Sequence, residues 1–418
     1  MTVLIKNART LESAERKDIL IDGSRIAQIA GAGAIKNADE KIDASGMLAM
    51  PGLVNMHTHI AMSMYRGYAD DMELMDWLQN KIWPLEDKTL NDDFVNLAVE
   101  LSCAEMIKSG TTSFLDMYTF QLKVGGLISK IGMRGYLGEA FFDFKSKDYE
   151  QGKALDFAKK FASSEFPKLI TPVIAAHAPY TCCEDTLIKT KEIANKHDML
   201  YHIHVAETKK EQDDIQKQKG KRVVKYLDDI KVLDKKTIAA HCVWLDDSEI
   251  DIFAKRGVTV AHCPNSNMKL ASGPAPIKKM LAKNVNVAIG TDGCASNNTL
   301  DLFREIKSAA LLSKLSTMDA TAVSAREAVE MATANAYKTL GLDCGLQQGK
   351  LADIILVDLR KPHLTPIYNA HSHMVYAANG SDVDTVIVNG KILMKSRKLK
   401  TIDEQALLEK AEKVAESV

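Results

Sequence analysis

The sequence predicts a (β/α)8 barrel accompanied by a small β unit that is built from both ends of the chain. Two observations favour the barrel: eight apolar runs of strand length lie between residues 52 and 293, and amphipathic helical stretches separate them. A third observation is the β-rich texture of both ends. An open doubly wound sheet is the alternative, although no Gly-x-Gly-x-x-Gly follows the first barrel strand.

The elements are expected in a simple order along the chain. Residues 1–54 contain strand-like runs separated by turn residues, such as "DILIDGSRIAQIA", and form the N-terminal part of a β-sandwich. Residues 55–345 form the barrel, with helices such as "DDSEIDIFAKRG" that end in glycine. Residues 346–418 return to β-rich runs and add a terminal helix. The eight barrel strands are expected in "GLVNMHTH", "TTSFLDM", "RGYLGEAFF", "LITPVIAAHAPY", "LYHIHVAE", "TIAAHC", "VTVAHCP" and "VNVAIGTDG".

Composition and charge narrow the classes of function. The 418 residues are 46% hydrophobic and 26% charged, and the formal net charge of -1 gives no reason to expect a nucleic-acid partner. No apolar run approaches the roughly 20 residues that span a bilayer, and the N-terminus does not resemble a signal peptide. Seven cysteines without a Cys-x-x-Cys indicate reduced thiols. We therefore expect a cytoplasmic protein without a membrane partner, compatible with a homo-oligomer.

Histidines and one aspartate stand at the ends of the predicted barrel strands. His57 and His59 end the first strand, His204 lies near the end of the fifth, His241 ends the sixth, and Asp292 follows the eighth. The carboxyl ends of barrel strands converge, so these side chains are expected to face one another. The His-x-His pair alone is a weak signal. A barrel interior buries charge only when it is paired or binds a metal, and three imidazoles with one carboxylate suit Zn²⁺, with Fe²⁺ as the alternative.

Several motifs resemble the amidohydrolase superfamily in its mononuclear-metal deaminase branch: "PGLVNMHTH", "HVAE", "AAHC", "HCPNSNMKLASG" and "GTDGCASNN". Two more, "DDMELMDWLQNKIWPLED" and "HAPYTC", are similar to those of the 5'-methylthioadenosine/S-adenosylhomocysteine deaminases, whose relatives include 5'-deoxyadenosine deaminases. The resemblance covers nearly the whole chain. It implies a (β/α)8 barrel with a small β-sandwich, and one metal ion held by His57, His59, His204 and Asp292.

The same resemblance implies the roles of the remaining site residues. Glu207, at the end of a His-x-x-Glu, would be the catalytic acid, while His241 and Asp292 would orient the attacking water and take its proton. Glu86 would contact the ribose hydroxyls, and His177 the purine ring. From the residues alone, Glu207 could instead be a solvated residue at a helix entry, and Glu86 an exposed loop carboxylate.

The implied reaction is hydrolytic deamination of a purine nucleoside. The adenine of 5'-methylthioadenosine, S-adenosylhomocysteine, 5'-deoxyadenosine or adenosine would become hypoxanthine, with release of ammonia. A related enzyme acting on guanine, cytosine or triazine-type rings is the first alternative. A non-catalytic barrel is the second, and the presence of all five strand-end ligand candidates argues against it.

Two features bear on the substrate's 5' group. Members of this family commonly carry an arginine near the end of the third strand, whereas this chain has Gly138-Glu139 there, and Arg134 lies earlier. Because a glutamate would repel a carboxylate tail, we expect uncharged 5' groups to be favoured. Residues 60–90 form a long connection rich in Met and Trp, which is either a lid that includes Met72 and Trp77 or helices packed on the barrel.

Overall fold

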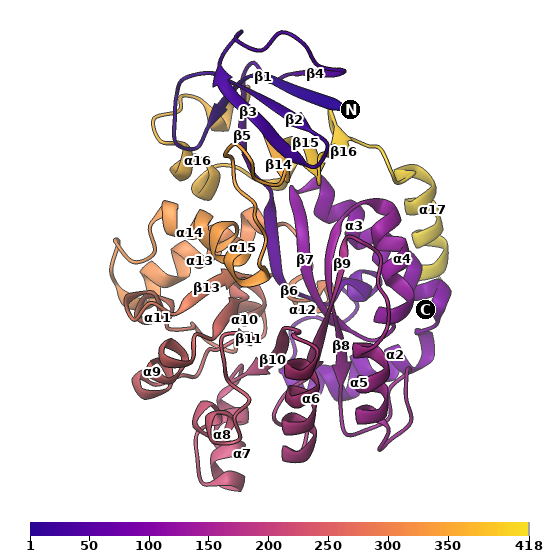
Figure 1. The fold of residues 1–418 in the computed structure, drawn as a ribbon. Coiled ribbons are helices and arrows are strands. Elements are labelled where there is room, and N and C mark those ends of the chain that lie inside the picture. Colours follow the sequence, from indigo (N-terminus) through magenta and orange to yellow (C-terminus); the bar gives the residue numbers. More distant parts are fainter. Residues whose placement is uncertain (417–418) are drawn as a thin grey trace.

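The computed structural model describes residues 1–416 and contains a barrel and a mixed β-sheet. The sheet lies at the top of Figure 1, and the barrel with its surrounding helices lies beneath it. The chain passes from the last N-terminal strand of the sheet into the first barrel strand through Gly52 alone. The amino ends of the barrel strands therefore lie on the side of the sheet, and their carboxyl ends open on the opposite side.

Within residues 1–416, eight parallel strands form the barrel sheet in sequence order. The first and last strands approach one another, and the amide of Asp292 donates to the carbonyl of His57 over 2.9 Å. The fold class predicted from the sequence is thus confirmed, with all eight strands in the predicted runs. The barrel strands are β6 (Leu53–Thr58), β7 (Thr111–Tyr118), β8 (Arg134–Phe141), β9 (Ile170–Ala176), β10 (Tyr201–Val205), β11 (Thr237–His241), β12 (Thr259–His262) and β13 (Asn286–Ile289).

The barrel strands are buried on both faces because helices cover their outer side and side chains fill the interior. Continuous apolar runs are typical of such strands. The lower interior is filled by small and aliphatic side chains, including Val54, Leu115, Val173 and Ile238. The hydroxyl of Tyr337 donates to the carbonyl of Gly52 and closes this end of the barrel.

Helices connect successive strands and surround the barrel, as Figure 1 shows. Most follow the expected pattern; the helix after β11, for example, begins with a capping box at Asp246 and ends at Gly257, which has a φ of 72°. The helices of this region are α3 (Asp92–Lys108), α4 (Gln121–Ile131), α5 (Ala154–Ala162), α6 (Glu184–Lys196), α7 (Lys209–Lys219), α8 (Val223–Asp229), α9 (Asp247–Arg256), α10 (Pro264–Lys269), α11 (Ile277–Ala282), α12 (Cys294–Asn297), α13 (Leu302–Thr317), α14 (Ala325–Met331) and α15 (Ala334–Leu340).

The mixed sheet joins the two ends of the chain, as the sequence predicts. The C-terminal strand β14 (Ile354–Asp358) pairs antiparallel with the N-terminal strand β5 (Met47–Pro51). The buried pair Arg134–Asp353, with Nε and Oδ2 3.0 Å apart, ties this sheet to the barrel. The remaining elements of this part are β1 (Thr2–Thr10), β2 (Lys17–Asp22), β3 (Arg25–Gly31), β4 (Glu40–Asp43), η3 (Pro362–Leu364), α16 (Ala370–Tyr376), η4 (Gly380–Asp382), β15 (Val383–Val388), β16 (Lys391–Lys395), β17 (Lys398–Leu399) and α17 (Glu404–Ala415).

The long connection after β6 is helical over most of its length. It consists of the 3-10 helix η1 (Ile60–Tyr65), α1 (Leu74–Trp77), the π-helical turn η2 (Leu78–Ile82) and α2 (Trp83–Thr89). Trp77 is buried against the barrel and also lines the pocket described below, whereas Met72 does not reach it. The connection therefore packs on the barrel and covers the pocket at the same time.

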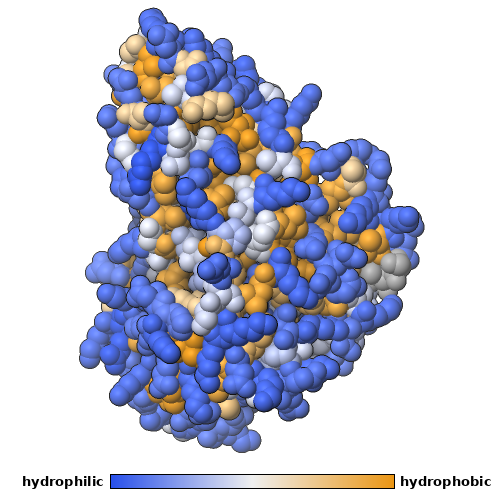
Figure 2. All heavy atoms as spheres, turned by 45° about the vertical axis from the view of Figure 1, so that its right-hand side comes forward, coloured by the Kyte–Doolittle hydropathy of each residue, from blue (hydrophilic) through white to orange (hydrophobic). Residues whose placement is uncertain are grey.

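The face of the molecule seen in the space-filling view of Figure 2 is mainly polar. Figure 2 shows hydrophilic residues over most of the visible face, with hydrophobic residues gathered mainly where the sheet meets the barrel. Among residues 1–416, none of the helices combines the length and the apolar character that crossing a membrane requires.

Candidate metal and catalytic site

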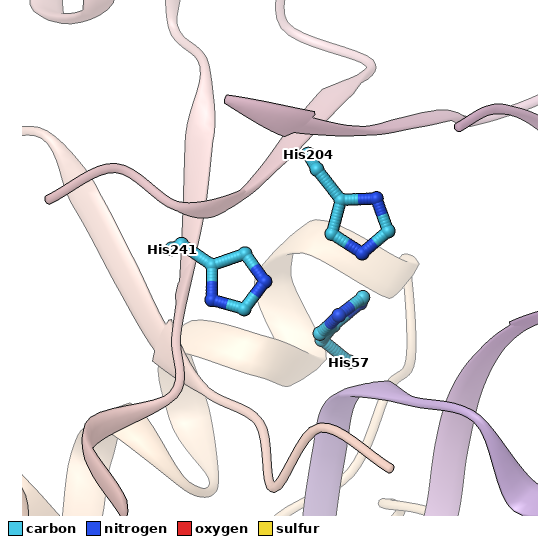
Figure 3. Close-up of side chains that lie close together, drawn as sticks. All are labelled: His57, His204 and His241. Atoms are coloured by element: carbon cyan, nitrogen blue, oxygen red, sulfur yellow. The ribbon is translucent and has the colours of Figure 1, made fainter. Parts of the chain in front are cut away.

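Three histidines from three strands meet at the carboxyl end of the barrel. The rings of His57, His204 and His241 point toward one another in Figure 3. Their ring centroids are 4.8 to 5.3 Å apart, and one nitrogen of each lies within 4.8 Å of the others. All three side chains are buried. This spacing suits a shared metal ion.

His57 also belongs to a second group of ligand atoms, with His59 and Asp292. Oδ1 of Asp292 lies 3.1 Å from Nε2 of His59 and 3.5 Å from Nε2 of His57. The structure therefore brings together all five residues that the sequence placed at strand ends. His241, for which only a catalytic role was expected, is as close to His57 and His204 as a ligand would be.

The hydrogen bonds of the four imidazoles leave the same nitrogen, Nε2, facing the centre of the site on each ring. In each case Nδ1 is bonded to an acceptor, so that Nε2 keeps its lone pair, the form in which a neutral imidazole binds a metal. The Nδ1 partners are His202 Nε2 for His57 (2.8 Å), the Met117 carbonyl for His59 (2.5 Å), the His177 carbonyl for His204 (2.6 Å) and Asn267 Oδ1 for His241 (2.9 Å).

His202 fixes the proton on His57. Its Nδ1 donates to the carbonyl of Ile238 over 3.0 Å, which leaves its Nε2 to accept from His57. Nε2 of His57 is then buried with no hydrogen-bond partner among the described residues. A buried polar atom without a partner is costly, and a metal ion would satisfy it. The donor set therefore fits a metal, and His202 lies one layer below it and supports the His57 ring.

The backbone and its neighbours hold Asp292 in place. Ser266 Oγ donates to Oδ2 over 2.6 Å and the Gly293 amide donates to Oδ1 over 2.7 Å. Asp292 and His241 both have positive φ angles, of 64° and 68°. Residues in this conformation cost free energy and persist only where the surrounding structure imposes them, often at functional sites.

Glu207 lies just past the end of β10, with Oε2 3.8 Å from Nε2 of His241. Glu211, one helical turn later, accepts from the amides of Ala206 and Glu207 over 2.9 Å each and so fixes the backbone of Glu207. Burial raises the pKa of the Glu207 carboxyl above its usual range. Such a carboxyl keeps its proton to higher pH than an exposed glutamate does.

A cavity of about 860 Å³ opens above these groups. Glu86 on α2 and His177 after β9 both line it, as does Glu207.

The Tyr118 hydroxyl donates to Glu86, and burial raises the pKa of this carboxyl to about 7. Burial, reinforced by His59 and His57, lowers the pKa of His177 to about 3, so this imidazole is neutral. Aromatic and aliphatic side chains form much of the remaining wall: Leu74, Trp77, Leu78, Trp83, Leu90, Phe142 and Phe144.

Glu139 does not take the place that the sequence argument gave it. In β8, Tyr136 and Ala140 face the barrel interior, so Glu139 points to the opposite face, where it is fully buried against α4. Glu139 is therefore not placed to repel a carboxylate tail, and the expected preference for uncharged 5' groups loses its basis. Arg134 is also remote from the pocket, because it pairs with Asp353 at the other end of the barrel.

Sequence reasoning missed the residues that support the site. Ser266, Asn267 and Glu211 hold Asp292, His241 and Glu207, respectively. Ser266 and Asn267 follow β12, so their place after a strand end was the one available signal. Glu211 looks like an ordinary helix residue in "KKEQDD", and its role depends on the tight backbone turn at Ala206.

Comparison with known proteins agrees with this geometry. The model of the Amidohydrolase family matches residues 48–393. A 5'-deoxyadenosine deaminase of Methanosarcina mazei is 44% identical over 100% of this chain and 98% of its own length. A 5-methylthioadenosine/S-adenosylhomocysteine deaminase of Thermococcus onnurineus is 46% identical over 96% of this chain and 95% of its own. The crystal structure of a zinc-bound adenosine deaminase from Xanthomonas campestris superimposes with a TM-score of 0.95 at 33% identity, over 100% of this chain and 98% of that one. This chain is therefore a hydrolase that belongs to the amidohydrolase family, within the group that contains the 5'-deoxyadenosine and 5'-methylthioadenosine/S-adenosylhomocysteine deaminases.

Proposed function

We propose that the protein is a metal-dependent deaminase that converts the adenine of 5'-modified adenosines to hypoxanthine and releases ammonia. One observation carries the proposal. Imidazole Nε2 atoms converge beside Asp292 and Glu207 in the same cavity that holds Glu86 and His177. The full-length relatives named as deaminases of such nucleosides support the same substrate class.

The metal would be held by His57, His59, His204 and Asp292. When bound there, a divalent ion such as Zn²⁺ lowers the pKa of water from about 15.7 toward about 7 and so supplies a nucleophile at neutral pH. Fe²⁺ fits the same donor set. The hydrogen-bonded Nδ1 atoms keep the rings oriented, as supporting residues do at metal sites.

The protein's own groups would move the protons. Addition of water at C6 of adenine requires a proton at N1, and Glu207 can supply one because burial raises its pKa. His241, whose Nδ1 is bonded to Asn267, has Nε2 free to accept a proton from the attacking water together with Asp292. That proton leaves with the amino group as ammonia, and the proton of the new C6 hydroxyl returns to Glu207 as the carbonyl forms, so one water enters and one ammonia departs. General acid-base groups typically contribute about 10²–10⁴-fold each.

The cavity would orient the nucleoside. Glu86 would accept hydrogen bonds from the ribose hydroxyls. The neutral His177, with Nδ1 2.9 Å from Thr181 Oγ1, would present its other nitrogen to the purine ring. The apolar walls would accommodate a 5' substituent such as deoxy or methylthio.

The test is ammonia release from a panel of nucleosides by protein whose metal content has been measured. We expect about one equivalent of zinc or iron per chain, and higher kcat/KM for 5'-deoxyadenosine and 5'-methylthioadenosine than for guanine, cytosine or triazines. S-adenosylhomocysteine belongs in the panel because Glu139 does not face the cavity. Protein with a full metal equivalent that releases no ammonia from any adenosine derivative would overturn the proposal.

A further inference from the structure

A pair of carboxyl groups, from the buried Glu139 and from the half-buried Asp148 in the cavity wall, lies outside the proposed reaction. Glu139 is fully buried; its Oε2 accepts from the amide of Gln121 over 3.1 Å, and its carboxyl is in hydrogen-bonding contact with that of Asp148. Its Oε1 finds no donor among the described residues. Two ionised carboxylates can only repel one another, so the contact is satisfied when a proton lies between them.

The pair fixes the segment that follows β8. Asp148 also accepts from the amide of Phe120 over 2.6 Å, and it lies in residues 142–150. Most of that segment lines the cavity. Lys147 of the same segment donates to the carbonyl of Asp87, and the ring of Phe144 lies 5.8 Å from that of Trp83. The segment therefore supports α2, the helix that carries Glu86.

The network continues toward the metal site on its other side. Gln121 Nε2 donates to Asp116 Oδ2 over 2.6 Å, and Asp116 Oδ1 accepts from the amide of Ile60 over 2.8 Å. Ile60 directly follows His59. One set of hydrogen bonds thus connects the segment after β6 with the segment after β8, through the carboxyl pair of Glu139 and Asp148.

The groups around Glu139 and Asp148 explain why a proton, and not a cationic side chain, bridges the two carboxyls. Asp116 of β7 and Asp148 of the 142–150 segment face Glu139, with the Tyr149 hydroxyl nearby. Lys123 of α4 lies near Asp148 but pairs with Asp92 of α3 over 2.5 Å. Burial, and then Asp148, raises the pKa of Glu139 well above its usual value.

We propose that Glu139 is a positioning residue whose protonated carboxyl donates to Asp148 and so holds residues 142–150 against the substrate cavity. Loss of this proton places two carboxylates in contact and loosens the segment. The effect on kinetics rests on the proposed deaminase function. In that enzyme KM rises at alkaline pH while kcat changes little, because Glu139 contacts neither the metal ligands nor Glu207.

Matched variants separate a proton-dependent role from simple packing. Glu139→Gln keeps a neutral donor toward Asp148 and an acceptor for Gln121, so KM at pH 7.5 should stay within about twofold of the wild type and its alkaline rise should disappear. Glu139→Leu leaves Asp148 without its donor, so KM should rise by about tenfold at pH 7.5, with kcat within about threefold. Exposed Glu165, changed to Gln, is the control and should keep the wild-type pH profile.

Asp148→Asn provides a second route if Glu139→Leu does not fold. The asparagine can accept from Phe120 and donate to an ionised Glu139, so the alkaline rise in KM should again disappear. An alkaline rise that persists in both Glu139→Gln and Asp148→Asn would overturn the proposal.

Tryptic cleavage at Lys145 and Lys147 gives a readout that needs no activity. At one fixed pH, the segment of Glu139→Leu should be cut several times faster than that of the wild type or Glu139→Gln, with fragments identified by mass. Equal cleavage rates would overturn the proposal even if the protein deaminates nucleosides. If no nucleoside is a substrate, faster cleavage would still support the positioning role while the proposed function fails.

Discussion

At the scale of single residues, the site depends on protonation states that the surroundings impose. Each of the four imidazoles donates through Nδ1 to an acceptor and turns Nε2 toward the centre. Burial raises the pKa values of the Glu86 and Glu207 carboxyls, because it favours their neutral forms. The site therefore offers imidazole nitrogens and the Asp292 carboxylate to a cation, and its two glutamates keep a proton to higher pH than exposed glutamates do.

Glu86 gives the pH dependence that is easiest to test. Its pKa is raised to about 7, so the carboxyl is neutral below that pH and ionised above it. The carboxylate accepts stronger hydrogen bonds from ribose hydroxyls than the acid does. KM for 5'-deoxyadenosine should therefore fall as pH rises from 6 to 8.

The matched variant is Glu86→Gln, which cannot ionise. It should lose this pH step and lower kcat/KM by about 10- to 100-fold, the range expected for hydrogen bonds to a charged group. A 2',3'-dideoxy analogue should show no step with the wild-type enzyme. An unchanged step in Glu86→Gln would show that another group titrates.

At the scale of secondary-structure elements, the close approach of β6 and β13 sets the position of His57. Gly290 directly follows the last strand, and a Cβ built there would lie 2.7 Å from both the backbone nitrogen and the Cβ of His57. Only glycine fits at this contact without displacing the ligand strand. The absence of a side chain at Gly290 thus helps to set the position of His57, a proposed metal ligand.

Gly290→Ala should therefore displace His57 and weaken metal binding. We expect a loss of about 1–3 kcal/mol of stability from overpacking, together with a lower metal content after dialysis. Gly126→Ala is the control, because a Cβ there has no neighbour within 4 Å and α4 gains helix propensity, worth about 0.5–1 kcal/mol. Full metal retention in Gly290→Ala would contradict the steric argument.

At the scale of the whole molecule, the mixed sheet is attached to the end of the barrel remote from the cavity. Arg134 begins β8 and reaches Asp353 just before β14, with 3.0 and 3.2 Å between their hydrogen-bonded atoms. Asp353 is buried and also accepts from the amide of Asn389. The pair joins two parts of the chain that are more than 200 residues apart in sequence.

Removal of the Asp353 side chain should lower the free energy of unfolding without changing the kinetics of the proposed reaction. Asp353→Ala leaves the largely buried Arg134 charge without a counter-ion, with only Asn389 Oδ1 as an acceptor, which costs up to about 3–5 kcal/mol. Asp358→Ala, at the end of β14, removes a more exposed pair with Arg360 and should cost less than about 1 kcal/mol. Urea-induced unfolding measures both, and KM at low temperature should match the wild type. Equal stability losses in the two variants would contradict the structural role.

The amino-acid sequence is sufficient to predict the barrel, the sheet made from both ends and the residues that meet at the centre. Hydrophobic runs of strand length identify β6 to β13, and the carboxyl ends of parallel strands must converge, so His57, His204, His241 and Asp292 could be brought together before any coordinates. Local pattern and strand geometry are sufficient for this, because each inference concerns a position along one strand.

The tertiary structure alone decided what lies beside these residues. Strands buried on both faces carry no polar alternation, so the pattern of β8 did not reveal that Glu139 faces α4 and not the cavity. His202, Glu211 and Asn267 act through hydrogen bonds to neighbours that strand pattern does not specify. Such contacts depend on how strands, turns and helices are packed in space, and packing is a property of the assembled fold.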